Sequence, residues 1–196
     1  KIVLCVGRMV PEKGFDVLLG AARFVIPNHN VKFVCVGDGY MKGKYLDDTR
    51  SLDVYNNFYF TGYMDDHTLK CLYQVADVVV VPSRYEPFGI VALEAMAART
   101  PVVVSDTGGL SEVVWHDHDG IKVWPGHSES LAWGINRVLG DQGHANWLIN
   151  NAHQKVTDIF NWRNVARRTR ETYLKSLSEF YISDWQPDVK FSFAKE

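Results

Sequence analysis

The feature that most constrains the fold is a repeated alternation of short apolar runs with longer segments in helical spacing. The first run is Ile2–Val6, and after a polar loop apolar side chains recur at helical spacing from Phe15 to Val25. The further runs are residues 31–36, 57–61, 77–81, 101–104 and, more weakly, 121–123, each followed by a loop and a helix-like segment. Strands that alternate with helices in this way pair in parallel.

The run Val78–Val81 is apolar at every position, which is typical of a strand with both sheet faces covered by helices. We therefore predict an α/β fold with a doubly wound parallel, Rossmann-like sheet. Ligands of such sheets bind at the carboxyl ends of the strands. The loops expected there all contain glycine and span residues 7–14, 37–40, 62–66, 82–89 and 105–109.

Beyond residue 128 the strand pattern stops. Three helical stretches follow, at residues 128–139, 145–157 and 162–178, and we place a domain over 1–178 and a carboxyl-terminal tail over 179–196. All six tryptophans lie after residue 110. We expect their rings to pack across the sheet and fill space, with docking of a partner domain as the alternative.

Composition excludes several classes of protein. With 46% apolar and 22% charged residues, the chain of 196 residues is too apolar to be disordered over most of its length. Lys and Arg (21) nearly balance Asp and Glu (23), so no basic field indicates nucleic acid, and any anion site must be local. No apolar stretch approaches the roughly 18 residues of a membrane-spanning helix, so no transmembrane segment is expected.

The cysteines bear on the redox compartment, and the first residue bears on whether the chain is part of a longer protein. Cys5, Cys35 and Cys71 form no CxxC pair, and the first two lie in apolar runs, as small buried hydrophobic residues do. This usage favours a reducing compartment. The chain opens at Lys1 directly on a strand-like run, so we expect it to be part of a longer protein.

The first loop, residues 7–14, places two cations after the first strand. Arg8 can grip phosphate oxygens with two hydrogen bonds, Lys13 acts as a point charge, and Gly14 lets the backbone come close. A pyrophosphate group would need such charges. The alternative is that both are solvated loop cations.

The loop at residues 82–89 leads into a helix that we expect to start near Pro87, because the fixed φ of proline suits a first helical turn. The free amides of that turn, at Gly89, Ile90 and Val91, would then form an anion site with a favourable helix dipole.

Two carboxylates flank that anion site, Glu86 before the helix and Glu94 within it, with seven residues between them. Carboxylates repel phosphate, so each would face a neutral, hydroxyl-rich part of the ligand. A molecule with a sugar, a pyrophosphate and a ribose in that order has this layout. The alternative makes Glu86 a helix N-terminal charge and Glu94 a surface residue.

Together these residues resemble the motifs of a known family. The chain is similar to the nucleotide-binding, carboxyl-terminal domain of retaining GT-B glycosyltransferases of the glycogen synthase and sucrose synthase type, called family GT4 or group 1. The resemblance covers about residues 1–178. The matching motifs are Gly7-Arg8-x4-Lys13-Gly14, Gly37-Asp38-Gly39, Gly62-Tyr63, Glu86-x7-Glu94 with Pro87-Phe88-Gly89, Thr107-Gly108-Gly109 with Glu112, Asp119-Gly120 to Pro125-Gly126, and Phe160-Asn161-Trp162.

The resemblance implies a role for each matching residue. Arg8 and Lys13 fall where the family neutralises the donor diphosphate, and Glu86 matches the carboxylate at the transferred sugar; we take these three as the catalytic candidates. Glu94 matches the carboxylate that holds the ribose, and Tyr63 falls where relatives pack against the base.

The backbone amides of Gly89, Ile90 and Val91 fall where the family meets phosphate and sugar, so with Glu94 and Tyr63 they complete the expected substrate-binding set. The chain would then be the carboxyl-terminal half of a GT-B fold and the nucleotide-sugar-binding domain of a hexosyltransferase.

The resemblance also implies a reaction, the transfer of a hexose from a nucleotide diphosphate sugar to an acceptor hydroxyl with retention of configuration. No cofactor is expected, since the nucleotide sugar is a substrate. The family's acceptor pocket lies on an amino-terminal domain that is missing here, so the isolated chain should bind donor but turn over little. We expect a cytoplasmic location, with peripheral membrane association of the full-length protein left open.

The chain departs from the family pattern at two positions. Arg99 stands where many relatives have glycine, and we expect a shifted helix cap there without loss of function. His127 replaces a commonly acidic residue, from which little follows.

The run His116-Asp117-His118-Asp119 has alternate metal-ligand types, but no third ligand is obvious nearby and we expect no metal site. Two other functions stay open. One is a binding or regulatory module on the same sheet; the other, a dinucleotide oxidoreductase, is disfavoured because no GxGxxG follows the first strand.

Overall fold

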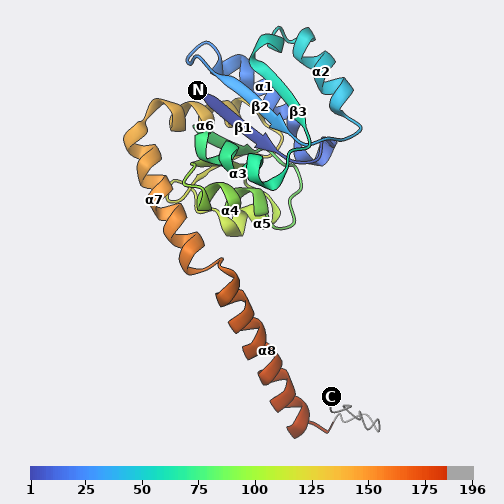
Figure 1. Ribbon diagram of the computed structural model, residues 1–196, viewed down its shortest axis with the longest axis vertical. Helices are drawn as coiled ribbons and strands as arrows, with labels where there is room; N and C mark the ends of the chain where they lie inside the picture. The colour runs from blue at the N-terminus through green and yellow to red at the C-terminus, as the bar shows by residue number, and fades with distance from the viewer. Residues whose placement is uncertain (185–196) are drawn as a thin grey trace. The chain divides into compact units, whose positions relative to one another are not determined.

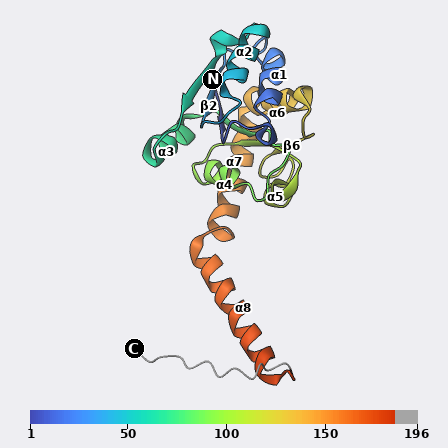
Figure 2. The same cartoon turned by 90° about the vertical axis from the view of Figure 1, so that its right-hand side faces the viewer.

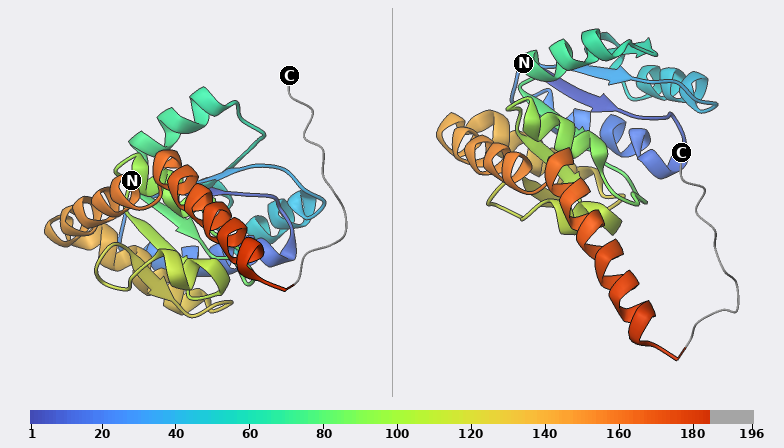
Figure 3. Two further views of the ribbon diagram at one scale, coloured as in Figure 1. Left: turned by 90° about the horizontal axis from the view of Figure 1, so that it is seen from below. Right: turned by 60° about the horizontal axis from the view of Figure 1, so that its bottom comes forward.

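The computed structural model describes residues 1–184. The chain divides into two compact units, Lys1–Thr157 and a second that begins at Asp158. The first unit holds a single sheet with strand order β3-β2-β1-β4-β5-β6, and every pairing is parallel. Figures 1 and 3 show this sheet as a twisted layer between helices.

The strands lie within one residue of the ends that the apolar runs predict. Their bounds are β1 Ile2–Val6, β2 Lys32–Val36, β3 Phe58–Gly62, β4 Val78–Val81, β5 Val102–Ser105 and β6 Ile121–Val123. Both β4 and β5 are buried at every position, which agrees with a sheet covered on both faces. The predicted doubly wound, Rossmann-like architecture is confirmed.

The helices follow the strands in chain order. They are α1 Phe15–Val25, α2 Lys42–Ser51, α3 Asp66–Val75, α4 Ile90–Ala97, α5 Gly108–Val113, α6 Ser128–Gly140, α7 Gln142–Asp158 and, in the second unit, α8 Trp162–Ile182, with short 3-10 turns η1 Pro11–Lys13 and η2 Tyr55–Asn57. Right-handed crossovers place α1 and α2 on one face and α3, α4 and α5 on the other. The helix α6 packs against α1 and so lies on the first face.

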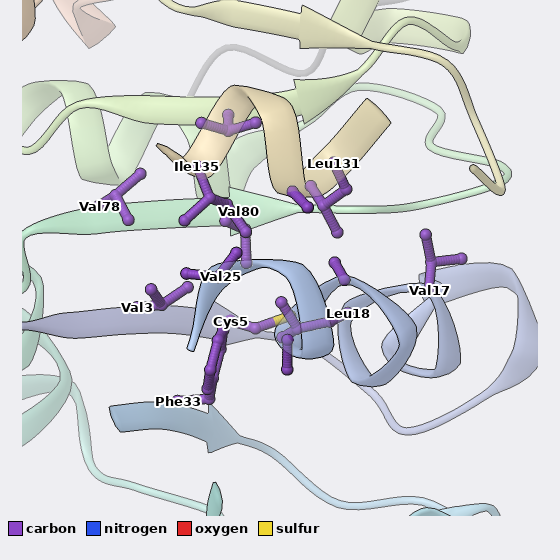
Figure 4. Packing of buried hydrophobic residues seen from close by; sticks show 14 of the residues in the cluster. Val3, Cys5, Val17, Leu18, Val25, Phe33, Val78, Val80, Leu131 and Ile135 are labelled. Atoms are coloured by element: carbon purple, nitrogen blue, oxygen red, sulfur yellow. The ribbon is translucent and has the colours of Figure 1, made fainter. Parts of the chain in front are cut away.

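The core on the α1 and α6 face explains why the aliphatic periodicity of α1 is so clear. Figure 4 shows Leu18 and Val25 of α1 and Leu131 and Ile135 of α6 converging on strand residues such as Val80. All five side chains are fully buried. Cys5 and Cys35, which are register partners on β1 and β2, are buried free thiols, as predicted from their apolar runs.

The expectation that the tryptophan rings fill space in the core is wrong for every tryptophan that the structure describes. All five are exposed: Trp115, Trp124, Trp133, Trp147 and Trp162. Trp185 lies outside the described residues. Aliphatic side chains of α1 and α6 already fill the space over the sheet.

The expected shift of the helix cap at Arg99 is also wrong. Arg99 adopts the left-handed conformation itself, with φ 62°. The amide of Thr100 donates to the carbonyl of Ala95 at 3.0 Å and that of Arg99 to Met96 at 3.2 Å, which is the Schellman pattern that closes many helices. This pattern requires a left-handed residue at position 99, where a non-glycine residue costs about 1–2 kcal/mol.

His127 acts as a helix cap. Its Nδ1 accepts a hydrogen bond from the amide of Ser130 at 3.2 Å in the first turn of α6. An acidic side chain at this position would accept the same bond.

The helix α8 runs on to Ile182, four residues beyond its predicted end, and its N-cap Asn161 accepts from the amide of Asn164 at 2.8 Å. The division into a domain over 1–178 and a tail over 179–196 stays a prediction, and residues 185–196 lie outside the described part.

Candidate functional site

The loops after β1 and β4 meet at the carboxyl edge of the sheet because these two strands are neighbours. The backbone amides of Arg84 and Tyr85 donate to the carbonyl of Glu12 at 2.8 and 3.3 Å. Gly14 has φ 68°, and a Cβ there would lie 2.0 Å from the carbonyl oxygen of Pro82. Glycine is therefore required at position 14 for the two loops to approach each other.

This approach brings Lys13 and Glu86 together. The ammonium of Lys13 lies 2.6 Å from Oε2 of Glu86, and both side chains are largely buried. The hydroxyl of Ser83, itself buried, donates to the same oxygen at 3.2 Å. An ammonium has three donors, so Lys13 can keep this contact and still bind a phosphate oxygen.

The loops are also joined by Arg84 and Asp16, a pair that no pattern in the sequence predicts. The guanidinium of Arg84 donates to both carboxylate oxygens of Asp16, at 2.8 and 2.6 Å, and to the carbonyl of Pro11 at 3.0 Å. Burial raises the pKa of Asp16, but the hydrogen bonds and charge of Arg84 outweigh it and the pKa is lowered. No spacing rule connects the two residues, since only the approach of the loops places them side by side.

The helix after β4 begins at Ile90, so the expectation that it starts near Pro87 is wrong. Gly89 is the N-cap, with a left-handed φ of 98°, and the turn before it packs on α5, where a Cβ at Gly109 would lie 2.5 Å from Cα of Phe88. The helix thus starts only after the turn that packs against α5.

Although the helix starts later than expected, the amides predicted to bind an anion still lie at its N-terminus. Gly89 is the N-cap, Ile90 and Val91 are the first two helical residues, and the first amide bonded within the turn is that of Ala92, at 3.1 Å to Gly89. Among the described residues the amides of Gly89, Ile90 and Val91 have no hydrogen-bond acceptor. They form the kind of donor group that binds anions at helix N-termini.

Glu94 lies on the side of α4 that faces α3. Its carboxylate accepts a hydrogen bond from the hydroxyl of Tyr73 at 2.8 Å. Burial, followed by the nearby charge of Glu94, raises the pKa of Tyr73 far above its usual range, so the hydroxyl stays a donor. The two side chains line a cavity of about 510 Å³ between the helices, together with Leu69 and Ala97.

Arg8 and Tyr63 are exposed and lie apart from these contacts. Within residues 1–184 Arg8 forms no ion pair, so its charge is available to a ligand. Tyr63 follows β3, which is two strands away from β1, and the structure does not bring its ring against another aromatic ring of the described chain.

The acidic and histidine side chains of residues 116–119 are committed to contacts within the protein. Asp119 is fully buried and lies 2.5 Å from the ammonium of Lys155, and Asp117 pairs with Arg137 at 2.9 Å. Nδ1 of His116 accepts from the amide of Lys122 at 3.0 Å. Within residues 1–184, no group of three or more metal-ligating side chains is arranged to hold an ion. None of the helices described is both long enough and apolar enough to cross a membrane.

Comparison with known proteins defines the class. The sequence profile of the family "Glycosyl transferases group 1" matches residues 1–155, and the chain belongs to this family. It is 46% identical to an uncharacterized glycosyltransferase of Methanocaldococcus jannaschii, over 88% of this chain and 44% of that protein. It is 36% identical to the glycogen synthase of Mycobacterium tuberculosis, over 88% of this chain and 42% of that protein.

Among solved structures, HepE of Anabaena in complex with UDP matches with a TM-score of 0.82 and 29% identity, over 89% of this chain and 48% of that one. The chain therefore has the α/β fold of GT-B glycosyltransferases. It spans less than half the length of each of these relatives.

Proposed function

We propose that the chain is the carboxyl-terminal, donor-binding half of a retaining glycosyltransferase of family GT4. The full protein transfers a hexose from a nucleotide diphosphate sugar to an acceptor hydroxyl. The observation that carries the proposal is that Lys13 pairs with Glu86 where the loops after two adjacent strands approach each other, with the free amides at the start of α4 following Glu86 in the chain. The complex of the related HepE with UDP supports a nucleotide diphosphate as ligand.

Each part of the site then has one task. Arg8, Lys13 and the amides of Ile90 and Val91 hold the diphosphate. Gly89, the N-cap, has no side chain that would block access to these amides. Glu86 accepts hydrogen bonds from hydroxyls of the transferred sugar.

The nucleoside binds on the other side of the diphosphate. Glu94 accepts from the ribose hydroxyls at the cavity between α3 and α4, and the base packs near Tyr63. The hydroxyl of Tyr73 fixes the orientation of the Glu94 carboxylate.

The chemistry demanded of this half is mainly electrostatic. When the bond between the anomeric carbon and the diphosphate breaks, negative charge grows on the leaving oxygen. Fixed donors and cations aimed at that charge lower the barrier without rearranging during the reaction. Two basic side chains and a helix N-terminus supply the positive charge, so the proposal includes neither a metal nor another cofactor.

The acceptor site belongs to an amino-terminal domain in this proposal. The chain spans 44% of its relative from M. jannaschii, which leaves room for such a domain. The isolated chain then binds donor but transfers little sugar. Its free cysteines, two of them buried, are consistent with a cytoplasmic location, with peripheral membrane association of the full-length protein left open.

The test is a calorimetric panel of UDP, ADP, GDP and their glucose and mannose conjugates, each with and without EDTA. We expect at least one to bind, more weakly at high salt and equally with the chelator. Binding that depends on a divalent metal, or no binding by any of them, would contradict the proposal. Retention and transfer are tested on the longer protein, by the anomeric configuration of the product.

A further inference from the structure

The strand β6 forms the edge of the sheet opposite β3, and the helix α6 lies beside it (Figure 2). A second cavity is lined by residues of β6 and α6. Its volume is about 590 Å³, within the range of about 300–1,000 Å³ that is usual for small-molecule sites. It is lined by Asp106, His116, Lys122, Trp124, Ser130 and Trp133. None of these residues belongs to the loops after β1 and β4 or to α4.

The two tryptophans differ in how firmly they are held. The ring of Trp133, 49% exposed, lies 6.2 Å from the ring of His116 and 5.7 Å from the guanidinium carbon of Arg137. Trp124 is 75% exposed, and its ring has no aromatic or cationic neighbour among residues 1–184. Its backbone amide donates to the hydroxyl of Ser130 at 3.1 Å, which fixes the start of its side chain. In this cavity the ring of Trp133 is therefore held by neighbouring side chains, whereas the ring of Trp124 is free to contact a ligand.

The polar groups of the cavity offer both acceptors and donors. The carboxylate of Asp106 lies 2.9 Å from the ammonium of Lys122, and the side chain of Asp106 is 46% exposed. A hydrogen bond from Ser111, followed by the contact with Lys122, lowers the pKa of Asp106, which remains an acceptor. Because Nδ1 of His116 accepts from the amide of Lys122, the proton of the neutral ring is on Nε2, which is a donor.

The charges exclude some ligands. Asp106 and Lys122 cancel, and the ammonium of Lys122 already contacts both Asp106 and the carbonyl of Ser111, at 2.9 and 3.3 Å. The lining holds no further cation comparable to Arg8 of the proposed donor site, so the cavity has no net positive charge to attract a phosphate or another anion. A docking protein is disfavoured as well, since the centres of protein interfaces are depleted of charged residues. A neutral ligand with an apolar face and many hydroxyls fits an indole surface next to a carboxylate and an imidazole N–H.

We propose that this cavity binds a neutral saccharide, with a pyranose ring stacked on Trp124 or Trp133 and its hydroxyls bonded to Asp106 and His116. A pyranose presents a face of C–H groups to an aromatic ring and hydroxyls at its rim, which matches this lining. The cavity shares no lining residue with the proposed donor site, although the loop that carries Asp106 contacts the loop after β4 through the hydroxyl of Thr107, which donates to the carbonyl of Arg84 at 3.2 Å.

The experiment titrates the chain with neutral oligosaccharides of glucose, mannose, galactose and N-acetylglucosamine, followed by tryptophan fluorescence. We expect at least one to bind, with affinity reduced tenfold or more by Trp124→Ala or Trp133→Ala and several-fold by Asp106→Asn. Trp147→Ala is the matched control, since Trp147 is 46% exposed and lies on α7 outside the cavity lining. Circular dichroism checks that each variant is folded.

Four results would overturn the proposal. They are no binding by any oligosaccharide, an equal loss in Trp147→Ala, displacement of the saccharide by saturating nucleoside diphosphate, and a dimer in sedimentation that Trp124→Ala dissociates. Unchanged saccharide binding in Lys13→Ala supports it. Because the donor site is not used, failure here leaves the proposed function standing, and failure of nucleotide binding leaves this site standing.

Discussion

The guanidinium of Arg84 and the carboxylate of Asp16 form two hydrogen bonds, at 2.8 and 2.6 Å, that join the loop after β4 to the first turn of α1. Glu86 lies in the same loop as Arg84, and Lys13 lies three residues before Asp16, at the end of η1. The pair therefore holds the ammonium and the carboxylate of the proposed site at their separation of 2.6 Å before any ligand arrives.

The first prediction concerns this pair. Arg84→Met or Asp16→Asn should weaken the binding of a nucleoside diphosphate several-fold and leave the affinity for the parent nucleoside unchanged, because only the diphosphate uses the positioned Lys13. The cost to folding should be about 1 kcal/mol or less, as for other partly exposed ion pairs.

Calorimetry and chemical denaturation measure both effects. Arg50→Met, which removes an exposed pair with Asp47 on α2, is the matched control and should change neither affinity. If the affinities for the nucleoside and for the nucleoside diphosphate fall by the same factor, the pair of Arg84 and Asp16 does not act through Lys13.

The second prediction concerns Glu94. Glu94→Ala should remove about 1.5–3 kcal/mol of nucleotide affinity, the usual loss when a hydrogen bond to a charged group is removed. The variant should also lose its preference for a ribonucleotide over the 2′,3′-dideoxy form. Calorimetry with both nucleotides is the measurement.

The control for Glu94 is Tyr73→Phe, which removes the hydroxyl that orients the carboxylate. This variant should keep the ribose preference and lose less affinity. If Glu94→Ala discriminates as well as the unmodified chain does, Glu94 does not contact the ribose.

The third prediction concerns a buried ion pair outside the site. The ammonium of Lys155 lies 2.5 Å from the buried carboxylate of Asp119, donates to the carbonyl of Val113 at 2.9 Å and lies 4.1 Å from the ring centre of Trp115. Lys155→Met removes the ammonium from the buried carboxylate of Asp119, which keeps only the amide of Trp115 at 2.8 Å and a 3.5 Å contact with His118, so unfolding free energy should fall by about 3–5 kcal/mol.

Adding Asp119→Asn to Lys155→Met should restore part of that loss. Lys44→Met, which breaks an exposed pair with Asp48, should cost less than about 1 kcal/mol. A small effect of Lys155→Met in urea denaturation would mean that the pair contributes little to folding.

The fourth prediction concerns acid. Burial raises the pKa of Asp117, but Arg137 and His144 outweigh it and the pKa is lowered; the pKa values of Asp16 and Asp106 are lowered as well. The unfolded carboxyls, with pKa values of about 3.9, bind protons before the folded ones do. The contribution of these three carboxyls to stability should be constant above about pH 5 and fall as the pH drops through 4 and below the folded pKa values.

Urea denaturation at several pH values measures this dependence. Asp117→Asn should make the loss of stability below pH 5 less steep. Stability that rises on acidification would contradict the assigned direction of these pKa values.

The sequence was sufficient to predict the sheet and the edge at which its glycine-containing loops lie, while the role of that edge as a ligand site stays a prediction. Runs such as Val78–Val81 define strands without help from distant residues, and parallel order then places the glycine-containing loops at one edge. The sequence predicts that Lys13 and Glu86 lie near each other but not that they form an ion pair, since Lys13 is expected at the diphosphate and Glu86 at the transferred sugar.

Other features depend on contacts that no local pattern encodes. The start of α4 at Ile90 follows from packing of the preceding turn on α5, and the left-handed Arg99 follows from the way α4 ends. The size of the tryptophan rings predicts that they pack across the sheet and fill space. Aliphatic side chains from α1 and α6 occupy that space, which leaves rings such as Trp124 and Trp133 at the surface.

The central claim, that Arg8 and Lys13 bind the diphosphate of a nucleotide sugar, is tested most directly by one difference in affinity. The affinity of a nucleoside diphosphate relative to its nucleoside is measured for the unmodified chain, Arg8→Ala and Lys13→Ala. We predict that each variant loses about 1.5–3 kcal/mol of this difference, with nucleoside binding unchanged. An undiminished difference in both variants would contradict the claim and make the two cations ordinary surface charges.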